Sequence, residues 1–393
     1  MITNNPHGGN LRTNLEKAYA LGWVGNKENF IDASANLNPL GHPPWLNEIL
    51  YKAHENVTHY PDPDYLSLTN ATALYHKVPR GSIVFGNGAD EIMFALGRAL
   101  YKFFIHASCT NMQSQNQPRM QNLGVSNNSL KPEGMNHHET LKTGHFYHNH
   151  YHNHKPAAII AVPSYTSYGE ALTNAGFTVQ ETTYSQLSSM LQSFCTEKTK
   201  ETEPHISHNV DGCNRIKHES IENKINDSPY ITDNCTTLWI GAPNNPDGVL
   251  PFGYPESIIQ LADKYPHCIF VIDEAFIDFT EHTSLLQYIS TRSKLPENII
   301  VIRSLTKIFA VPGLRIGYAI VPEQLSQALR NEIPNWPLNT IAEQFSIRSF
   351  TLPDTFQYIE KTRLFITEEK QRIFSALDNY YTFSQSCANF YCI

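Results

Sequence analysis

The sequence predicts an α/β protein, with a mainly parallel central sheet in a large domain and a smaller C-terminal α/β domain. Two observations support this fold class. Short runs of apolar, often β-branched residues recur along the chain, and helix-length segments separate them. Runs that are apolar throughout, rather than alternating with polar residues, are typical of strands buried on both faces. Strand, helix and strand in succession favour parallel strands with helices on both faces of the sheet.

The expected elements follow in chain order. The strands are bounded by Gly, Pro or Asp and comprise Ser82–Phe85, Ala158–Val162, Thr237–Ile240, Cys268–Ile272 and Ile299–Ile302. The helices comprise Ala89–Phe104, Tyr168–Ala175, Tyr254–Lys264 and a long segment from Asp354 to Asp378. From about Pro322 the pattern is mostly helical, and a strand-like run, Ala388–Ile393, comes last.

Two polar stretches interrupt this pattern, residues 106–156 and 197–233, which are rich in Asn, His, Ser, Gln, Thr and Lys. They hold too few aliphatic residues to offset the entropy of ordering the chain, so we expect surface insertions. The predicted organisation is therefore an N-terminal arm with the start of the small lobe (1–50), a large domain that carries both insertions (51–320), and an incomplete small C-terminal domain (321–393).

The first insertion contains histidines that alternate with Asn and Tyr, at His145, His148, His150, His152 and His154. A tract of this kind can bind a transition metal. An unstructured polar excursion is the favoured interpretation, and no metal site is predicted.

Composition excludes several classes of protein. The net charge is −8 and the pI is about 6.1, which argues against binding nucleic acid through its phosphates. No run approaches the ~20 apolar residues that a membrane helix needs. The start, MITNNPHGGN, lacks the basic and apolar regions of a signal peptide, so we expect a cytoplasmic protein. Seven scattered cysteines without CxxC spacing favour reduced thiols over a disulfide framework or a zinc site.

Chemistry-bearing residues follow the predicted strands, where ligands bind in open parallel sheets. The first strand leads through residues 86–91, Gly-Asn-Gly-Ala-Asp-Glu, into a helix whose free N–H groups could hold an anion, although such a segment by itself is more often a plain tight turn. Asn245 lies in a Pro- and Asn-rich turn after another strand. Asp273 ends a buried strand, where an unpaired charge is costly, so a cationic group is expected to face it unless it caps a helix or forms an internal ion pair.

Lys307 follows the strand Ile299–Ile302 and is flanked by the hydroxyls of Ser304 and Thr306 and by Phe309. A lysine among hydroxyl and apolar groups is in the right setting for a lowered pKa and for Schiff-base formation. Most single lysines are solvated surface groups. The combination with the preceding residues is what singles this one out.

The order and spacing of these residues resemble the fold-type I pyridoxal-phosphate enzymes of the aminotransferase superfamily. The resemblance implies that Lys307 holds pyridoxal 5′-phosphate as a Schiff base and that Asp273 keeps its pyridine nitrogen protonated. It further implies that Asn245 hydrogen-bonds the 3′ oxygen of the ring and that Tyr165 stacks on the ring face. Phe276 stands where many of these enzymes have a tyrosine that shares the 3′ oxygen. The implied phosphate site comprises Gly88, Ala89, Asp90, Ser304, Thr306 and Arg315.

The segment Tyr60-Pro61-Asp62-Pro63-Asp64-Tyr65 is similar to one in the histidinol-phosphate aminotransferase branch of the superfamily. There the first tyrosine reaches across a dimer interface to the neighbour's cofactor phosphate. The resemblance therefore implies a homodimer in which Tyr60 completes the partner's site. Without that context the segment reads as a Pro-rich turn with a packed tyrosine.

The N-terminal segments 7–10 and 32–41, together with residues 273–279, resemble the threonine-phosphate decarboxylases of cobalamin biosynthesis. The resemblance implies decarboxylation of a small phosphorylated amino acid, L-threonine O-3-phosphate, to (R)-1-aminopropan-2-ol O-phosphate, with His7, Asn10 and Asn36 as candidate substrate contacts. Three alternatives stay open: a serine-phosphate decarboxylase, a histidinol-phosphate-type aminotransferase, and a truncated cofactor-binding remnant without activity.

Members of this branch continue through a further strand that carries an arginine for the substrate carboxylate. This chain ends at Ile393, before that position. Arg363 is the nearest candidate for the role, and a solvated helix is the favoured interpretation of its position. We therefore expect cofactor binding to survive better than catalysis.

Overall fold

The computed structural model describes residues 8–30, 34–115, 155–201, 235–290 and 296–393. His7, the five histidines between 145 and 154, and most of both predicted insertions lie outside the described residues. Within the described residues, no helix combines the length and the apolar character needed to cross a membrane.

In the part of the chain that the structure describes, seven strands form one sheet in the order β1-β7-β6-β5-β4-β2-β3. The strands are β1 (Ile83–Asn87), β2 (Ala157–Val162), β3 (Thr178–Thr183), β4 (Cys235–Gly241), β5 (Ile269–Asp273), β6 (Ile299–Ser304) and β7 (Ile316–Ile320). β7 is antiparallel to both of its neighbours, and the other described pairings are parallel. The prediction of a mainly parallel sheet is therefore confirmed.

The five predicted strands are all present, with ends shifted by one or two residues. Two further strands were not predicted. β3 lies at the edge of the sheet and reads Thr-Val-Gln-Glu-Thr-Thr, because an edge strand exposed on one side does not need a continuous apolar run. β7 is fully buried but short, and Gly317 interrupts its apolar pattern.

The helices of the described residues are α1 (Leu11–Ala20), α2 (Trp45–Asn56), α3 (Leu66–His76), α4 (Ala89–Gln115), α5 (Ser167–Ala175), α6 (Tyr184–Glu201), α7 (Glu256–Lys264), α8 (Leu285–Ser290), α9 (Leu305–Ile308), α10 (Glu323–Arg330), α11 (Thr340–Thr351) and α12 (Asp354–Leu377). Short 3-10 turns lie at Lys27–Asn29, Arg80–Ser82, Ile277–Phe279 and Pro312–Leu314. α4 and α6 extend past the predicted starts of the two insertions, 106 and 197. The bounds of the two insertions stay a prediction.

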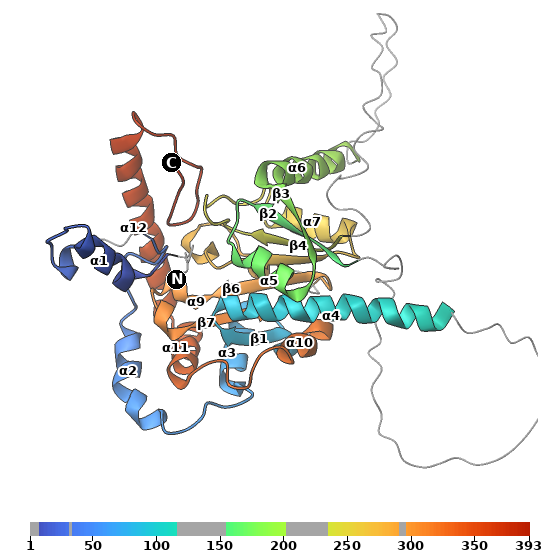
Figure 1. Ribbon diagram of the computed structural model, residues 1–393, viewed down its shortest axis with the longest axis horizontal. Helices are drawn as coiled ribbons and strands as arrows, with labels where there is room; N and C mark the ends of the chain where they lie inside the picture. Colours follow the sequence, from blue (N-terminus) through green and yellow to red (C-terminus); the bar gives the residue numbers. More distant parts are fainter. Residues whose placement is uncertain (1–7, 31–33, 116–154, 202–234, 291–295) are drawn as a thin grey trace, which may run out of the picture.

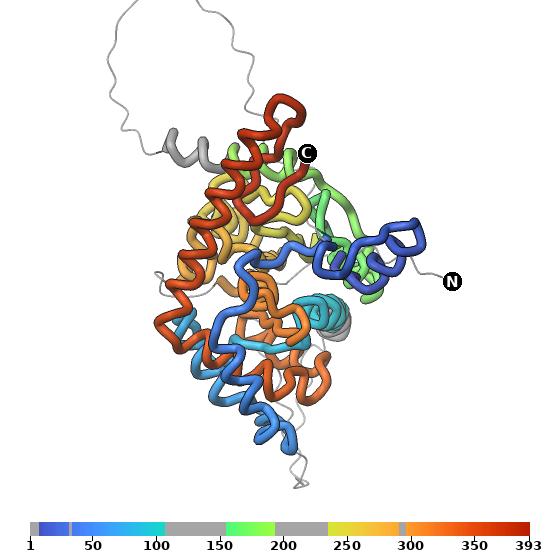
Figure 2. The backbone as a smooth tube through the Cα atoms, turned by 90° about the vertical axis from the view of Figure 1, so that its left-hand side faces the viewer, coloured from blue at the N-terminus to red at the C-terminus, as the bar shows by residue number. Residues whose placement is uncertain are grey.

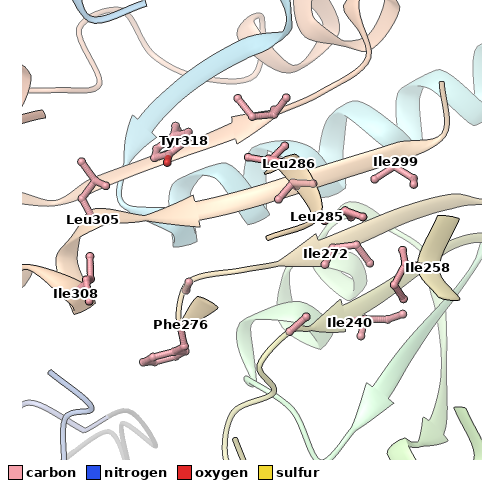
Figure 3. Packing of buried hydrophobic residues seen from close by; sticks show 14 of the residues in the cluster. Ile240, Ile258, Ile272, Phe276, Leu285, Leu286, Ile299, Leu305, Ile308 and Tyr318 are labelled. Carbon is pink, nitrogen blue, oxygen red and sulfur yellow. The ribbon is translucent and has the colours of Figure 1, made fainter. Parts of the chain in front are cut away.

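Two apolar clusters lie on opposite faces of the sheet, as the alternation along β1 shows. Val84 belongs to one cluster with α4, α5 and α10, whereas Ile83 and Phe85 belong to the other, with α3, α6, α7, α11 and α12. Figure 1 shows α4 and α5 together in front of the sheet. The second cluster is drawn in Figure 3, where Ile240 and Ile272 of adjacent strands lie near Ile258 of α7. Each fully buried Leu or Ile contributes about 1.5–3 kcal/mol of transfer free energy.

The C-terminal run Ala388–Ile393 is not a strand, and that prediction was wrong. Its neighbourhood bonds to loops instead: the Cys387 N–H donates to the Gly248 carbonyl (2.9 Å), and the Ser384 N–H donates to the Cys392 carbonyl (2.9 Å). The Asn389 side-chain amide donates to the Leu37 carbonyl (3.1 Å). Backbone groups paired this way form a compact turn rather than a sheet ladder. The proposed domain boundaries at 50 and 320 stay a prediction.

Candidate active site

The polarity of the strands gathers the functional residues at one edge of the sheet. The parallel strands end there, at Asn87, Gly241, Asp273 and Ser304. Because β7 runs the opposite way, the residue before it, Arg315, lies at the same edge. A pocket opens at this edge, and it is lined by Gly88, Ala89, Asp90, Met93, Tyr165, Tyr168, Pro243, Asn245, Asp273, Ala275, Phe276, Ser304, Thr306, Lys307 and Arg315.

The structure brings ten of the predicted cofactor residues together in this pocket. They are Gly88, Ala89, Asp90, Tyr165, Asn245, Asp273, Ser304, Thr306, Lys307 and Arg315. Tyr60, the eleventh, does not line it. Five lining residues were not predicted as contacts: Met93, Tyr168, Pro243, Ala275 and Phe276.

Asp273 is buried at the end of β5 and holds two hydrogen bonds. Its Oδ2 accepts from the Tyr168 hydroxyl (2.7 Å) and its Oδ1 from the Ala275 N–H (2.9 Å). Burial raises the pKa of Asp273 to about 6, with a smaller upward effect from Asp90; the two hydrogen bonds and the charge of Lys307 act in the opposite direction. The carboxylate is thus largely charged at neutral pH, and a cation in the pocket would stabilise it.

Lys307 lies on the short helix α9 directly after β6. Ser304 caps this helix, its hydroxyl lying 2.8 Å from that of Thr306 and accepting from the Thr306 N–H (3.4 Å). Burial lowers the pKa of the Lys307 ammonium and Arg315 adds to the effect, while Asp90 and Asp273 oppose it. A lowered pKa favours the neutral, nucleophilic amine.

At the part of the pocket formed by Gly88 and Arg315, the backbone comes close to the arginine side chain. Gly88 has a φ of +87°, and a Cβ there would lie 2.4 Å from Nη2 of Arg315. A Cβ on Gly317 would lie 2.3 Å from the Gly88 carbonyl carbon, so both positions require glycine. α4 begins at Ala89 and presents its free N–H groups here.

Asp90 connects this end to the aromatic wall of the pocket. The Tyr165 hydroxyl donates to Oδ1 of Asp90 (2.9 Å), and Nη2 of Arg315 lies 3.6 Å from Oδ2. Tyr165 is thereby held on the side of the pocket, with its ring 6.0 Å from that of Tyr168 in an edge-to-face arrangement.

Of the predicted substrate contacts, His7 lies outside the described residues, and the other two do not line the pocket. Asn10 caps α1 through its side chain, which accepts from the Thr13 N–H (3.4 Å), and neither it nor Asn36 is among the described lining residues. Asn38, which was not predicted, anchors the segment instead. Its N–H donates to the Lys307 carbonyl (3.1 Å) and its side-chain amide to the Ile308 carbonyl (2.7 Å). Figure 2 shows this N-terminal segment running beside the orange segment that carries α9.

Arg363 does not face the pocket. Its Nε donates to the Asp278 carbonyl (2.9 Å) and its Nη1 lies 2.7 Å from Glu360. It therefore ties α12 to the turn after β5, and it is part-buried rather than fully solvated.

A cluster of buried and half-buried charged residues lies next to the pocket in sequence, beside the lining residues Asp273 and Ser304. Arg303 on β6 donates to Glu274 (2.8 Å) and makes two bonds to Asp278 (2.7 and 2.8 Å). Glu274 also accepts from the Ser284 hydroxyl and the Leu285 N–H, each at 2.6 Å. Sequence spacing gave no signal for this cluster, because its members are brought together only by the pairing of β5 with β6.

Tyr60 lies on the surface, 80% exposed, and its ring stacks on Trp336 with centroids 4.7 Å apart. The two described segments around it, residues 57–61 and 339–341, line a separate open groove. Tyr60 is therefore not among the described residues that line the pocket of its own chain.

Two curated proteins are similar in sequence to most of this chain. The adenosylcobalamin biosynthesis bifunctional protein CobDQ of Leptospira interrogans is 27% identical over 374 residues, 95% of this chain and 32% of that protein. The threonine-phosphate decarboxylase of Salmonella typhimurium is 27% identical over 345 residues, 87% of this chain and 69% of that protein. The chain thus spans about a third of the first relative and about two thirds of the second.

Solved structures share the fold. The L-threonine-O-3-phosphate decarboxylase of Porphyromonas gingivalis superposes with a TM-score of 0.56 at 17% identity, over 90% of this chain and 79% of that one. A histidinol-phosphate aminotransferase of Sinorhizobium meliloti in complex with pyridoxal-5′-phosphate gives 0.59 at 17% identity, over 91% and 73%. Histidinol-phosphate aminotransferases also occur among the sequence relatives.

The pocket residues fit pyridoxal 5′-phosphate. A buried lysine with a lowered pKa can bond an aldehyde, and the buried carboxylate of Asp273 suits a protonated ring nitrogen. The helix start at Ala89, the hydroxyls of Ser304 and Thr306 and the guanidinium of Arg315 form a donor set for a phosphate. Residues 150–393 match the family described as aminotransferase class I and II. The chain belongs to that family, with a fold-type I architecture and pyridoxal 5′-phosphate as its cofactor.

Proposed function

We propose that this protein decarboxylates L-threonine O-3-phosphate, releasing carbon dioxide and (R)-1-aminopropan-2-ol O-phosphate for cobalamin synthesis. The observation that carries the proposal is the likeness to a threonine-phosphate decarboxylase over 87% of the chain. The pocket supports it, because it combines an amine nucleophile, a buried carboxylate and an anion-binding end. A cytoplasmic location stays a prediction.

The ring end of the cofactor is assigned to four residues. Lys307 would be the attachment point, Asp273 would hold the ring nitrogen, and Asn245 would bond the 3′ oxygen. Tyr165, fixed by its bond to Asp90, would cover one ring face. When bound, the cofactor draws electron density away from the substrate Cα, which allows a bond to that carbon to break.

The phosphate end is assigned to the backbone of Gly88–Asp90, the hydroxyls of Ser304 and Thr306, and the guanidinium of Arg315. Gly88 lets the backbone approach Arg315 closely, and Gly317 lets β7 approach the backbone of Gly88 and Ala89. These donors would hold the phosphate and so restrict how the cofactor lies relative to Lys307.

The choice of reaction depends on orientation. Of the bonds at Cα, the one held perpendicular to the ring plane is weakened, so a decarboxylase must hold the carboxylate there. His7, Asn10 and Asn36 remain our proposed substrate contacts. They lie on the N-terminal segment that Asn38 ties to α9. After carbon dioxide leaves, Lys307 returns a proton to Cα; its lowered pKa suits this role.

We further assign Tyr60 to the neighbouring site of a homodimer. Its exposure and its stacking on Trp336 leave the hydroxyl available to a second chain. The partner's phosphate end would receive it, in addition to the donors that each chain supplies itself.

The test is mass-resolved product analysis of the purified, cofactor-loaded protein with threonine phosphate, serine phosphate and histidinol phosphate, each with and without 2-oxoglutarate. We expect aminopropanol phosphate and carbon dioxide from threonine phosphate, independent of the oxo acid. Amino transfer to 2-oxoglutarate from histidinol phosphate would instead establish an aminotransferase. Turnover of serine phosphate alone would move the substrate assignment to the smaller amino acid, and no turnover of any of them would overturn the proposal.

A further inference from the structure

One buried tyrosine of the pocket is not used by the mechanism above. Tyr168 lies at the start of α5, its side chain is buried, and its hydroxyl donates to Oδ2 of Asp273 (2.7 Å). Its ring is held between those of Tyr165 (6.0 Å) and Trp239 (5.9 Å). The packed rings therefore restrain the hydroxyl oxygen at its position beside the carboxylate.

The geometry around Asp273 divides the carboxylate into occupied and available positions. Tyr168 bonds one oxygen and the Ala275 N–H bonds the other (2.9 Å). A carboxylate oxygen accepts more than one bond, so each retains acceptor capacity toward the pocket that Asp273 lines. The two donors, the Tyr168 hydroxyl and the Ala275 N–H, hold the carboxylate in one orientation. In that orientation its remaining lone pairs can accept a hydrogen bond from a ligand in the pocket.

Electrostatics favours the same role. Asp273 faces the like charge of Asp90 and the opposite charge of Lys307, and burial opposes its ionisation. The Tyr168 hydroxyl keeps its proton and can donate it to Asp273, because burial and Asp273 together raise its pKa well above the usual value. Of the effects that keep Asp273 ionised, the bond from Tyr168 comes before those of Ala275 and Lys307. An ionised carboxylate is the form that can hold a pyridinium.

We propose that Tyr168 is a positioning residue, which acts through Asp273 to hold the ring nitrogen of the cofactor in its protonated form. The inference rests on the proposed placement of Asp273 against that nitrogen. It adds a residue that makes no contact with the nitrogen itself and whose contribution disappears when the nitrogen is absent.

The experiment compares two ligands that differ at one atom. The cofactor-free protein is titrated with pyridoxal 5′-phosphate and with its carbocyclic analogue, in which a C–H replaces the ring nitrogen. The quantity measured is the ratio of the analogue's Kd to the cofactor's Kd. We expect Tyr168→Phe to lower this ratio about tenfold, as for loss of a bond to a charged group, by weakening cofactor binding and leaving analogue binding within twofold.

Tyr184→Phe is the matched control. Tyr184 is also buried near the pocket, and its hydroxyl donates to the Gly241 carbonyl rather than to Asp273. The variant therefore removes a comparable hydroxyl, and we expect the ratio to stay at the wild-type value. If Tyr168→Phe weakens both ligands equally, or leaves the ratio unchanged, the role of Tyr168 is structural and the inference is wrong.

Two further variants separate the possible failures. Asp273→Asn should bring the ratio near one, and adding Tyr168→Phe to it should change nothing more. If the Kd ratio of Asp273→Asn stays at the wild-type value, the proposed placement of Asp273 against the ring nitrogen is wrong, and not only the role of Tyr168. Should Tyr168→Phe fail to fold in a urea titration, 3-fluorotyrosine at position 168 keeps the ring and makes a stronger donor. We expect it to raise the ratio, and an unchanged or lower ratio contradicts the inference.

Discussion

The cofactor end of the pocket is built from strand ends, whereas the proposed substrate contacts lie on irregular chain near the N-terminus. Asp273 ends β5 and Lys307 follows the adjacent strand β6. The Asp273 carboxylate accepts from the Ala275 N–H, and the Lys307 carbonyl accepts from the Asn38 N–H. Asn10 instead caps an exposed helix, and Asn36 lies two residues before its nearest anchor, Asn38. The pairing of strands determines the first group, while the second depends on a few loop contacts.

This difference has a consequence for how the site fails. A substitution at the cofactor end removes either the covalent attachment or a buried charge of β5 and β6, so its effect on activity or stability should be large. A substitution near the proposed substrate contacts leaves those groups in place, so its effect should be smaller. The following variants test this contrast, in order of decreasing effect.

Replacing Lys307 with Ala should have the largest effect. The amine is the proposed attachment point and the proton donor, so the visible absorbance of the loaded enzyme should disappear and turnover should fall by about 10²–10⁴-fold or more. Lys370→Ala is the control, because the Lys370 ammonium is also partly buried with a lowered pKa but bonds the Ser386 carbonyl (2.9 Å) away from the pocket residues. Absorbance that survives in the Lys307 variant would exclude it as the attachment point.

Replacing Arg303 with Leu should cost about 3–5 kcal/mol of unfolding free energy, measured by urea denaturation. The variant leaves Glu274 and Asp278 buried or half-buried without their cation. Arg348→Leu removes a half-exposed ion pair with Glu48 (3.0 Å) and should cost within about 1 kcal/mol. Similar losses in the two variants would show that the charged cluster around Arg303 contributes no more than a surface pair.

The ionisation of Asp273 should make stability depend on pH. Its pKa is raised from 3.8 to about 6 on folding, so the folded state binds the proton more tightly than the unfolded chain. The cofactor-free protein should therefore lose stability as pH rises from about 4 to 6, by up to about 3 kcal/mol relative to Asp273→Asn. Urea titrations of both proteins across this range measure the difference. A difference that stays flat, or that grows with rising pH, would contradict the raised pKa.

The same contrast explains which parts could be predicted from the sequence. Continuous apolar runs gave five strands, and the residues after them gave ten of the pocket residues, because strand ends converge whenever strands are parallel. β3 was missed because an edge strand can be polar, and the run at 388–393 was wrongly predicted because an apolar segment forms a strand only where a partner strand is present.

Tyr168 and Arg303 show what sequence could not provide. Tyr168 lies three residues after the predicted cofactor contact Tyr165, and Arg303 directly precedes the predicted phosphate contact Ser304. Their roles depend on partners on other elements, Asp273 for one and Glu274 with Asp278 for the other. A tyrosine at the start of a helix beside a strand-end carboxylate was the available signal for Tyr168, and it acquires meaning only when the order of the strands is known.

Replacing Tyr60 should have the smallest effect on cofactor binding, and complementation between two inactive or weakened chains can test its role across a dimer. One more hydrogen bond to a phosphate is worth about 1–2 kcal/mol, so Tyr60→Phe should weaken cofactor binding by about tenfold.

If the residue acts across a dimer, mixing Tyr60→Ala with Lys307→Ala should restore activity in heterodimers. One site of each heterodimer then has Lys307 from one chain and Tyr60 from the other, while the second site has neither. Leu66→Ala, an exposed apolar side chain of α3, is the control that should not complement Lys307→Ala beyond simple dilution. If the Tyr60 mixture does no better, Tyr60 serves its own chain, and the periphery of this site is built without a partner's help.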